Sequence, residues 1–191
     1  MTTFLITAPA TEPATLDEVK LHIRQDSSIG ALEDALLNRL IKSARQRAEH
    51  MTSRAFITQT WGVRLDAFPT LIELVRSPVI SITDVKYLDS TGVEQTINAA
   101  DYILDNFGTT GFIAPAYGKS WPSTYQQINA VRVQYVAGYG AAAAVPECVK
   151  DWMLLVIEDA YRNRGATVDA TIKPHPFLDS ILDPITVQRI G

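Results

Sequence analysis

The segment "GFIAPAYGKSWPST", residues 111–124, contains residue types of a phosphate-binding loop. That loop has the spacing G-x-x-x-x-G-K-[ST], in which backbone amides and the lysine hold nucleotide phosphates. Gly118-Lys119-Ser120 matches its end, but Ile113 occupies the position of the leading glycine. Pro122 also disfavours helical backbone at the preceding residue, so no helix begins where the phosphates need its N-terminus. The spacing argues against nucleotide binding, and we expect Lys119 to be solvated or at a subunit contact.

The other residues that could do chemistry form no recognisable set. The three histidines, His22, His50 and His175, lack the paired spacing of metal ligands. The single cysteine, Cys148, has no nearby base to activate it as a nucleophile. Carboxylate pairs occur at Asp101/Asp105, Glu158/Asp159 and Asp179/Asp183. Because glycoside chemistry also needs a groove of defined width, these pairs alone predict no activity. We predict a protein that is not an enzyme and uses no cofactor or metal, with a ligand-binding or hydrolytic β module as the alternative.

Composition narrows the class of protein further. The 191 residues carry a net charge of −4, which argues against a general nucleic-acid binder. No apolar run approaches the ~20 residues that span a bilayer, and the first residues lack the basic start of a signal peptide. One cysteine excludes an internal disulfide and suits assembly in a reducing cytoplasm. Residues 31–54 nevertheless hold five basic and three acidic side chains. This excess is either a solvated helix face or a docking face for an acidic partner.

Helical patterns lie toward both ends of the chain. In "TLDEVKLHIR", Thr15 and Glu18 have the spacing of a capping box, which predicts a helix start. A longer helix is predicted after Gly30, with the apolar stripe Leu36, Leu40, Ile41, Ala44, Ala48 and Met51. A third is predicted from Pro146 to Gly165, with the stripe Val149, Met153, Val156, Ile157 and Ala160. Since no single helix can bury its stripe alone, we expect the three to pack together.

Short strands are predicted between the second and third helices. In "AVRVQYVAGYG" apolar and polar residues alternate, which places Val131, Val133 and Tyr135 on one face. The turn "DSTG" predicts a hairpin over residues 80–97. Other strands are predicted in "FITQTWGVRLDAF", "LIELVR" and "DYILD". Six or seven such strands predict a small sandwich or barrel-like unit, mainly antiparallel.

The predicted fold class is therefore α+β: a small bundle of three main helices, an inserted antiparallel β subdomain and an extended C-terminal arm. The expected divisions are N-terminal helices over 1–54, the β subdomain over 55–145, the last bundle helix over 146–165 and the arm over 166–191. Within the arm, large apolar residues recur at helical spacing: Phe177, Leu178, Ile181 and Leu182. This segment either folds back onto its own core or docks on another subunit or partner.

Several strings occur in a fixed order between Thr15 and Leu182, the most specific being "ITQTW", "APAYGKSWP" and "NAVRVQYVAGYG". In them the chain resembles the head–tail connector (adaptor) proteins of long-tailed phages, prophages and gene-transfer agents. None of these strings is catalytic, so the resemblance rests on their order and position. Another tail or baseplate component is the alternative within the same class.

The resemblance implies a virion protein made in the bacterial host cytoplasm and located at the head–tail junction. Such adaptors form a ring, usually of twelve copies, beneath the portal protein, extend the DNA channel and carry the stopper or tail-completion protein. Genome DNA would pass without specific binding. The C-terminal segment would dock on the portal through Phe177, Leu178, Ile181 and Leu182. A basic helix facing the channel would attract DNA, so we expect Arg39, Lys42, Arg45 and Arg47 at a subunit or portal contact.

Overall fold

The computed structural model describes residues 1–25, 31–163 and 176–187. Its contacts divide the chain into two compact units. The β unit comprises Met1–Ala10 and Ser53–Tyr139, and the helical unit comprises Thr11–Thr52 and Gly140–Gly191. The predicted combination of helices with antiparallel sheets, an α+β fold, is confirmed.

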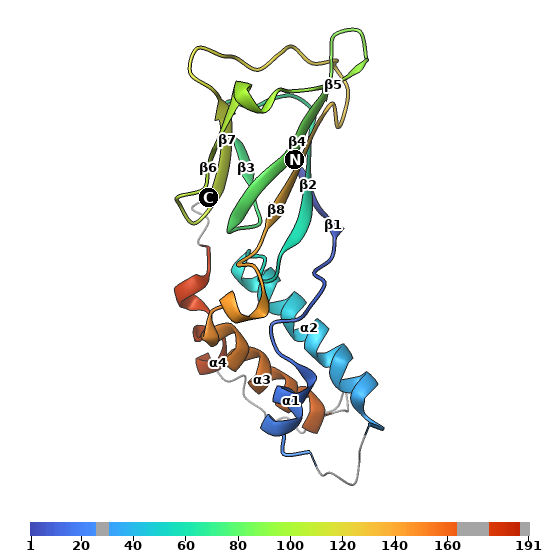
Figure 1. Cartoon of the computed structure of the whole chain (residues 1–191), viewed down its shortest axis with the longest axis vertical. Helices are drawn as coiled ribbons and strands as arrows, with labels where there is room; N and C mark the ends of the chain where they lie inside the picture. Colours follow the sequence, from blue (N-terminus) through green and yellow to red (C-terminus); the bar gives the residue numbers. More distant parts are fainter. Residues whose placement is uncertain (26–30, 164–175, 188–191) are drawn as a thin grey trace. The chain divides into compact units, whose positions relative to one another are not determined.

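The β unit contains two antiparallel sheets (Figure 1). The larger sheet has the order β1 (Thr2–Thr7), β2 (Gln59–Leu65), β8 (Val131–Ala137), β4 (Val79–Leu88) and β5 (Glu94–Thr96). The smaller sheet has the order β3 (Ile72–Leu74), β7 (Gly111–Pro115) and β6 (Tyr102–Asp105), with the short 3-10 helix η2 (Ala99–Asp101) just before β6. Lys86 pairs with Thr96 and Leu88 with Glu94, so the predicted hairpin over residues 80–97 forms.

One apolar core lies between the side chains of the two sheets. Val133 on β8 is buried, as its alternating sequence predicts, while its neighbour Arg132 is exposed. The cluster joins Val85 of the larger sheet to Ile72 and Ile113 of the smaller one. Burial on alternate positions of each strand is what holds two such sheets together.

The N-terminal strand β1 was not predicted from the sequence. It pairs with β2, where Phe4 lies opposite Gly62. A Cβ atom on Gly62 would lie 2.5 Å from the Phe4 ring, so the missing side chain makes room for that ring. The first ten residues therefore belong to the β unit, and the predicted helical region over 1–54 is shorter at its start.

The helical unit contains α1 (Leu16–His22), α2 (Asp34–Thr52), α3 (Glu147–Arg162) and α4 (Pro176–Ser180), with the 3-10 helices η3 (Ala142–Ala144) and η4 (Asp183–Ile185). Thr15 and Glu18 form the predicted capping box at the start of α1. The helices α1, α2 and α3 contact one another, and α4 contacts α3.

The buried faces of α2 and α3 differ from the predicted stripes. On α2, Leu37 is fully buried, whereas the predicted Leu36 is only half-buried. On α3, Trp152 is fully buried between the predicted Val149 and Met153. The face of α2 also buries polar residues at helical spacing, namely Arg45, Glu49 and Thr52. The prediction considered apolar residues alone. Because these three polar residues also belong to the buried face, the observed face differs from the predicted apolar stripe.

Candidate functional site

The segment that resembles a phosphate loop forms a turn and a corner. Gly118 has a φ angle of 74°, which favours glycine, and Lys119 Nζ lies 2.9 Å from Asp101 Oδ1. A phosphate would have to displace this carboxylate. Trp121 stacks on Phe68 with ring centroids 4.7 Å apart, at the border of the core. The adjacent hollow of about 320 Å³ is lined by both members of the Lys119–Asp101 pair.

The remaining catalytic candidates are dispersed. His22 Nε2 lies 3.1 Å from Glu158 Oε2, His50 is exposed, and His175 lies outside the described residues. Cys148 is half-buried in the first turn of α3. Across residues 1–25, 31–163 and 176–187, histidine, cysteine and carboxylate side chains form no group that could hold a metal ion. No helix in these ranges is long and apolar enough to cross a membrane.

Three of the four predicted contact cations lie on the exposed surface of α2: Arg39, Lys42 and Arg47. The guanidinium of Arg47 lies 5.6 Å from the centroid of the Trp152 ring, a cation–π contact that restrains its position. Their side chains are therefore accessible to a partner.

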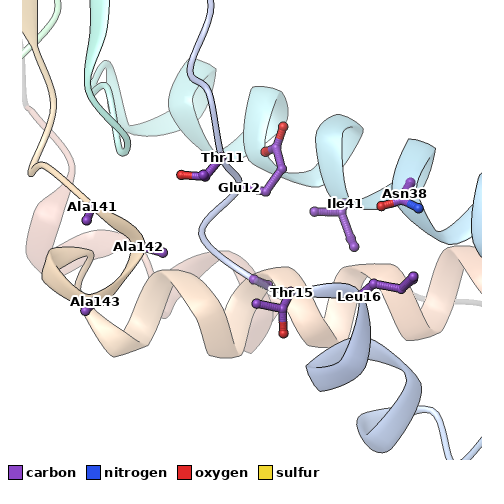
Figure 2. A pocket seen from close by; sticks show the side chains of 10 residues that line it. Thr11, Glu12, Thr15, Leu16, Asn38, Ile41, Ala141, Ala142 and Ala143 are labelled. Atoms are coloured by element: carbon purple, nitrogen blue, oxygen red, sulfur yellow. The ribbon is translucent and has the colours of Figure 1, made fainter.

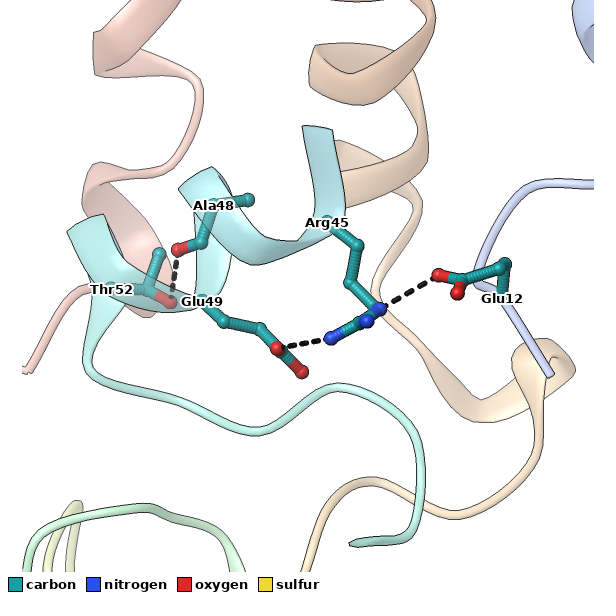
Figure 3. Close-up of polar contacts among 5 residues, drawn as sticks. All are labelled: Glu12, Arg45, Ala48, Glu49 and Thr52. Carbon is teal, nitrogen blue, oxygen red and sulfur yellow. Dashed lines mark hydrogen bonds and ion pairs between the residues drawn. The ribbon is translucent and has the colours of Figure 1, made fainter. Parts of the chain in front are cut away.

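Arg45 differs, because its side chain is buried within the helical unit (Figure 3). Its Nε donates to Glu12 Oε2 at 2.7 Å, and Nη1 donates to Glu49 Oε2 at 2.6 Å. The side chains of Arg45 and Glu49 are each 7% exposed. The expectation that Arg45 contacts a partner is corrected, since its charge is neutralised inside the subunit. Its spacing of four residues from Glu49 was the signal in the sequence.

The predicted arm anchors fall into two groups. Leu182 is 1% exposed and packs within the helical unit, whereas Phe177 is 76% exposed. Leu178 and Ile181 are half-buried. The segment is tied back by Val187 N, which donates to Thr52 O at 3.1 Å. The segment was predicted either to fold back onto its own core or to dock on a partner. Leu182 folds back onto the core, whereas Phe177 is exposed and so is available to a partner. Residues 164–175 and 188–191 of the predicted arm lie outside the described residues.

The helical unit also has an open hollow of about 550 Å³ (Figure 2). Its walls come from the segment before α1, from α2 and from the residues around η3: Thr11, Glu12, Ala14, Thr15, Leu16, Asn38, Ile41, Ala141, Ala142 and Ala143. Small and apolar side chains dominate this lining, so the hollow lacks the converging polar groups typical of a catalytic pocket.

These features are surfaces for contact: exposed cations on α2, an exposed aromatic residue on α4 and an open apolar hollow. Surfaces of this kind are typical of the class of proteins that bind other macromolecules.

Known proteins that resemble this chain include one family and several solved structures. A family model described as "Phage gp6-like head-tail connector protein" matches residues 13–91. The predicted resemblance to head–tail connectors is confirmed over that segment. Among curated proteins, no match is found.

Solved structures with the same fold come from gene transfer agent (GTA) particles. A chain from the neck of an empty GTA particle, computed with C6 symmetry, is 21% identical with a TM-score of 0.82. A chain from the virion of the native particle is 23% identical with a TM-score of 0.80. A chain from the native neck, computed with C12 symmetry, is 22% identical with a TM-score of 0.76. Each match covers 100% of this chain and 98% of the other.

Proposed function

We propose that this chain is a structural head–tail connector that forms a ring beneath a portal protein, extends the DNA channel and carries a stopper or tail. The observation that supports this most directly is the match of the whole chain to neck chains of GTA particles. The C12 symmetry of one such neck supports a ring of twelve copies. The protein acts at the head–tail junction through contacts, without turnover.

In this role the helices α1, α2 and α3 act as a bundle that presents the arm. Phe177 is the residue of the arm that reaches the portal, since its ring is exposed, while Leu182 fixes the base of the arm. Leu178 and Ile181 are half-buried and become fully covered on docking. Exposed aromatic residues are frequent energetic centres of protein interfaces.

The exposed cations of α2 serve a neighbouring subunit or the portal. Arg39, Lys42 and Arg47 provide positive charge on a chain whose net charge is −4. Such a surface attracts an acidic protein partner, and its contribution weakens as salt rises. Facing away from the channel, it leaves DNA free to pass.

The substitution Phe177→Asp tests the docking role. We expect about tenfold weaker attachment to purified portal particles, because a charged side chain replaces a buried aromatic anchor. Attachment is measured by cosedimentation and by electron microscopy of the particles. Leu21→Asp, at an 82% exposed position on α1, is the matched control.

The melting temperature of both free variants should equal that of the wild type, since both side chains project into solvent. Wild-type attachment that is retained by Phe177→Asp would contradict the arm assignment. Failure of the wild-type protein to attach to any portal particle would contradict the connector function itself.

A further inference from the structure

The outer edge of β1 is an open sheet edge that carries neither charged residues nor proline. In Figure 1, β1 lies at the border of the larger sheet, and within the described residues β2 is the one strand that pairs with it. Thr2–Thr7 contains no charged residue and no proline, and none of its residues is buried. Leu5 and Ile6 are 42% and 45% exposed. Proteins normally block such an edge with charges or proline, because its free backbone groups are a template for another strand.

The far side of the same sheet has a second open stretch, on β4. The terminal strand β5 pairs only with Lys86–Leu88 of this strand. Over Ile80–Asp84, β4 pairs with β8 on one side, and no described strand pairs with it on the other. Ile80 in this stretch is 47% exposed. Each open edge therefore combines unpaired backbone with an exposed apolar side chain.

The strand directions make these two edges compatible. The pairs β1–β2, β2–β8 and β8–β4 are all antiparallel, so β4 runs opposite to β1. If a second copy in the same orientation placed its β4 beside β1, the new pair would also be antiparallel. Pairing with β5 would instead be parallel, and β5 has three residues. Antiparallel pairing is the slightly more stable of the two arrangements per residue.

The sequences of the two edges are also low in charge. Thr2–Thr7 is uncharged, and the Ile80–Asp84 stretch carries one carboxylate, Asp84, at its end. Among the other terminal strands, β5 carries Glu94, β3 carries Glu73 and β6 carries Asp105. The register of β1 shifts between Leu5 and Thr7, and that of β4 shifts after Val79 and after Ile82. Such irregularities bend a strand, so the two edges can pair only where their bends match.

We propose that β1 of one copy pairs with the Ile80–Asp84 edge of β4 in the next copy, so that the larger sheets join into a continuous intersubunit sheet. The contact unites two different surfaces, and a contact of this kind closes into a ring when the rotation between copies permits. The inference rests on the proposed connector function, because the β1–β4 contact would join the copies of the proposed ring. The occupant of the β1 edge is thus a second copy of this chain.

Lysine substitutions on either edge test the pairing. One variant carries Leu5→Lys with Ile6→Lys, and the other carries Ile80→Lys with Thr83→Lys. All four side chains are exposed, and lysine on an edge strand opposes strand addition. We expect about tenfold or greater weakening of self-association for each variant, as several intersubunit hydrogen bonds are lost. Val93→Lys, at a 55% exposed position between β4 and β5, is the control and should assemble normally.

Mixing the two lysine variants adds a sharper outcome. Each retains the edge that the other lacks, so an equal mixture should form pairs of copies but no ring. The readouts are sedimentation velocity of the free protein and copy number on portal particles. If both variants join portal particles in wild-type numbers, the inference fails and the connector function stands. If the wild-type protein does not join portal particles, the proposed connector function itself is contradicted.

Disulfide cross-linking gives a measurement that does not depend on weakened assembly. In a Cys148→Ser background, Leu5→Cys is combined in turn with Ile80→Cys and with Ile82→Cys. Oxidation of assembled particles should link successive copies into a ladder, because every copy carries both edges. Linkage by Leu5→Cys alone would indicate a two-fold contact between β1 strands, and linkage to the portal would indicate another occupant. Either result, or no linkage in the whole series, overturns the proposal.

Discussion

At the scale of single residues, Arg45 links the segment before α1 to α2 through two ion pairs. Replacing it by methionine keeps the packing volume but leaves Glu49 buried without this cation. We expect Arg45→Met to lower the free energy of unfolding by about 3–5 kcal/mol, the effect of breaking a buried pair. The measurement is urea denaturation followed by the circular dichroism of the helices.

Lys42→Met is the matched control for Arg45→Met, since Lys42 is an exposed cation on the same helix. Its effect should stay within about 0.5 kcal/mol, as for surface substitutions in general. Equal urea midpoints for the two variants would show that the network around Arg45 contributes nothing to folding.

Asp89 holds the turn between β4 and β5. Its carboxylate accepts hydrogen bonds from Thr91 Oγ1, Gln95 Nε2 and the backbone amides of Thr91 and Val93. These bonds, with that from the Thr91 hydroxyl foremost, lower the pKa of Asp89 from 3.8 to about 2. Because the pKa is lower in the folded turn than in the unfolded chain, the ionised carboxylate stabilises the turn at any pH above the unfolded-state pKa. This stabilisation is lost as the pH falls through the folded-state pKa.

We therefore expect the turn to loosen between pH values of about 4 and 2. The protection of the Thr91 and Val93 amides, measured against their intrinsic exchange rates at each pH, should fall in this range. The Asp89 carboxyl should titrate with a midpoint near the lower end, as followed by NMR. In Asp89→Ala these amides should show little protection at any pH. A midpoint of the wild-type carboxyl near 3.8 would contradict the assignment.

At the scale of elements, the α4 segment contains both a fixed and a free residue. Leu182 is buried, so Leu182→Ala should remove packing worth about 2–5 kcal/mol and release the segment locally. Limited proteolysis should then cleave within residues 176–187 faster than in the wild type. Phe177→Ala, at an exposed position, should leave the cleavage rate unchanged. Equal cleavage of both variants would mean that Leu182 does not hold the segment.

The difference in burial between Leu182 and Phe177 also determines which change in the arm tests portal docking. A deletion of residues 166–191 would remove the buried Leu182 together with the exposed Phe177. Loss of portal attachment in such a truncation could then result from damage to the helical unit. Substitutions at Phe177 separate the contact from the packing.

Elements with a strong local pattern were predictable from the sequence. The alternation in β8, the turn at Asp89 and the Thr15–Glu18 capping box each depend on neighbouring residues, and each forms as expected. The strand β1 was not predictable, because both its faces are partly exposed at a sheet edge and "TTFLIT" shows no alternation. Arg45 was predicted to be exposed because charged side chains normally are. Its burial depends on Glu12 and Glu49, which come from two separate segments, so the neighbouring sequence alone did not indicate it.

At the scale of the whole molecule, the proposed contacts are individually modest and repeat in every subunit. A ring multiplies them, so a small loss per copy becomes a large loss of attachment. The net charge of −4 is consistent with the proposed channel role, in which DNA passes without being retained, because tight binding would require neutralising many phosphates. The proposed docking residue Phe177 and the proposed sheet edges lie in different units, so a substitution can change the residues of one contact without changing those of the other.

The three tryptophans are divided between the units: Trp61 and Trp121 lie in the β unit, and Trp152 lies in the helical unit. Trp152 is fully shielded from water, whereas the other two are partly exposed. With phenylalanine at positions 61 and 121, Trp152 would be the only indole left to emit. Its fluorescence would then report on the helical unit alone. The emission maximum would move to longer wavelength when water reaches the indole ring. The chain thus contains an optical probe of one unit that needs no added dye.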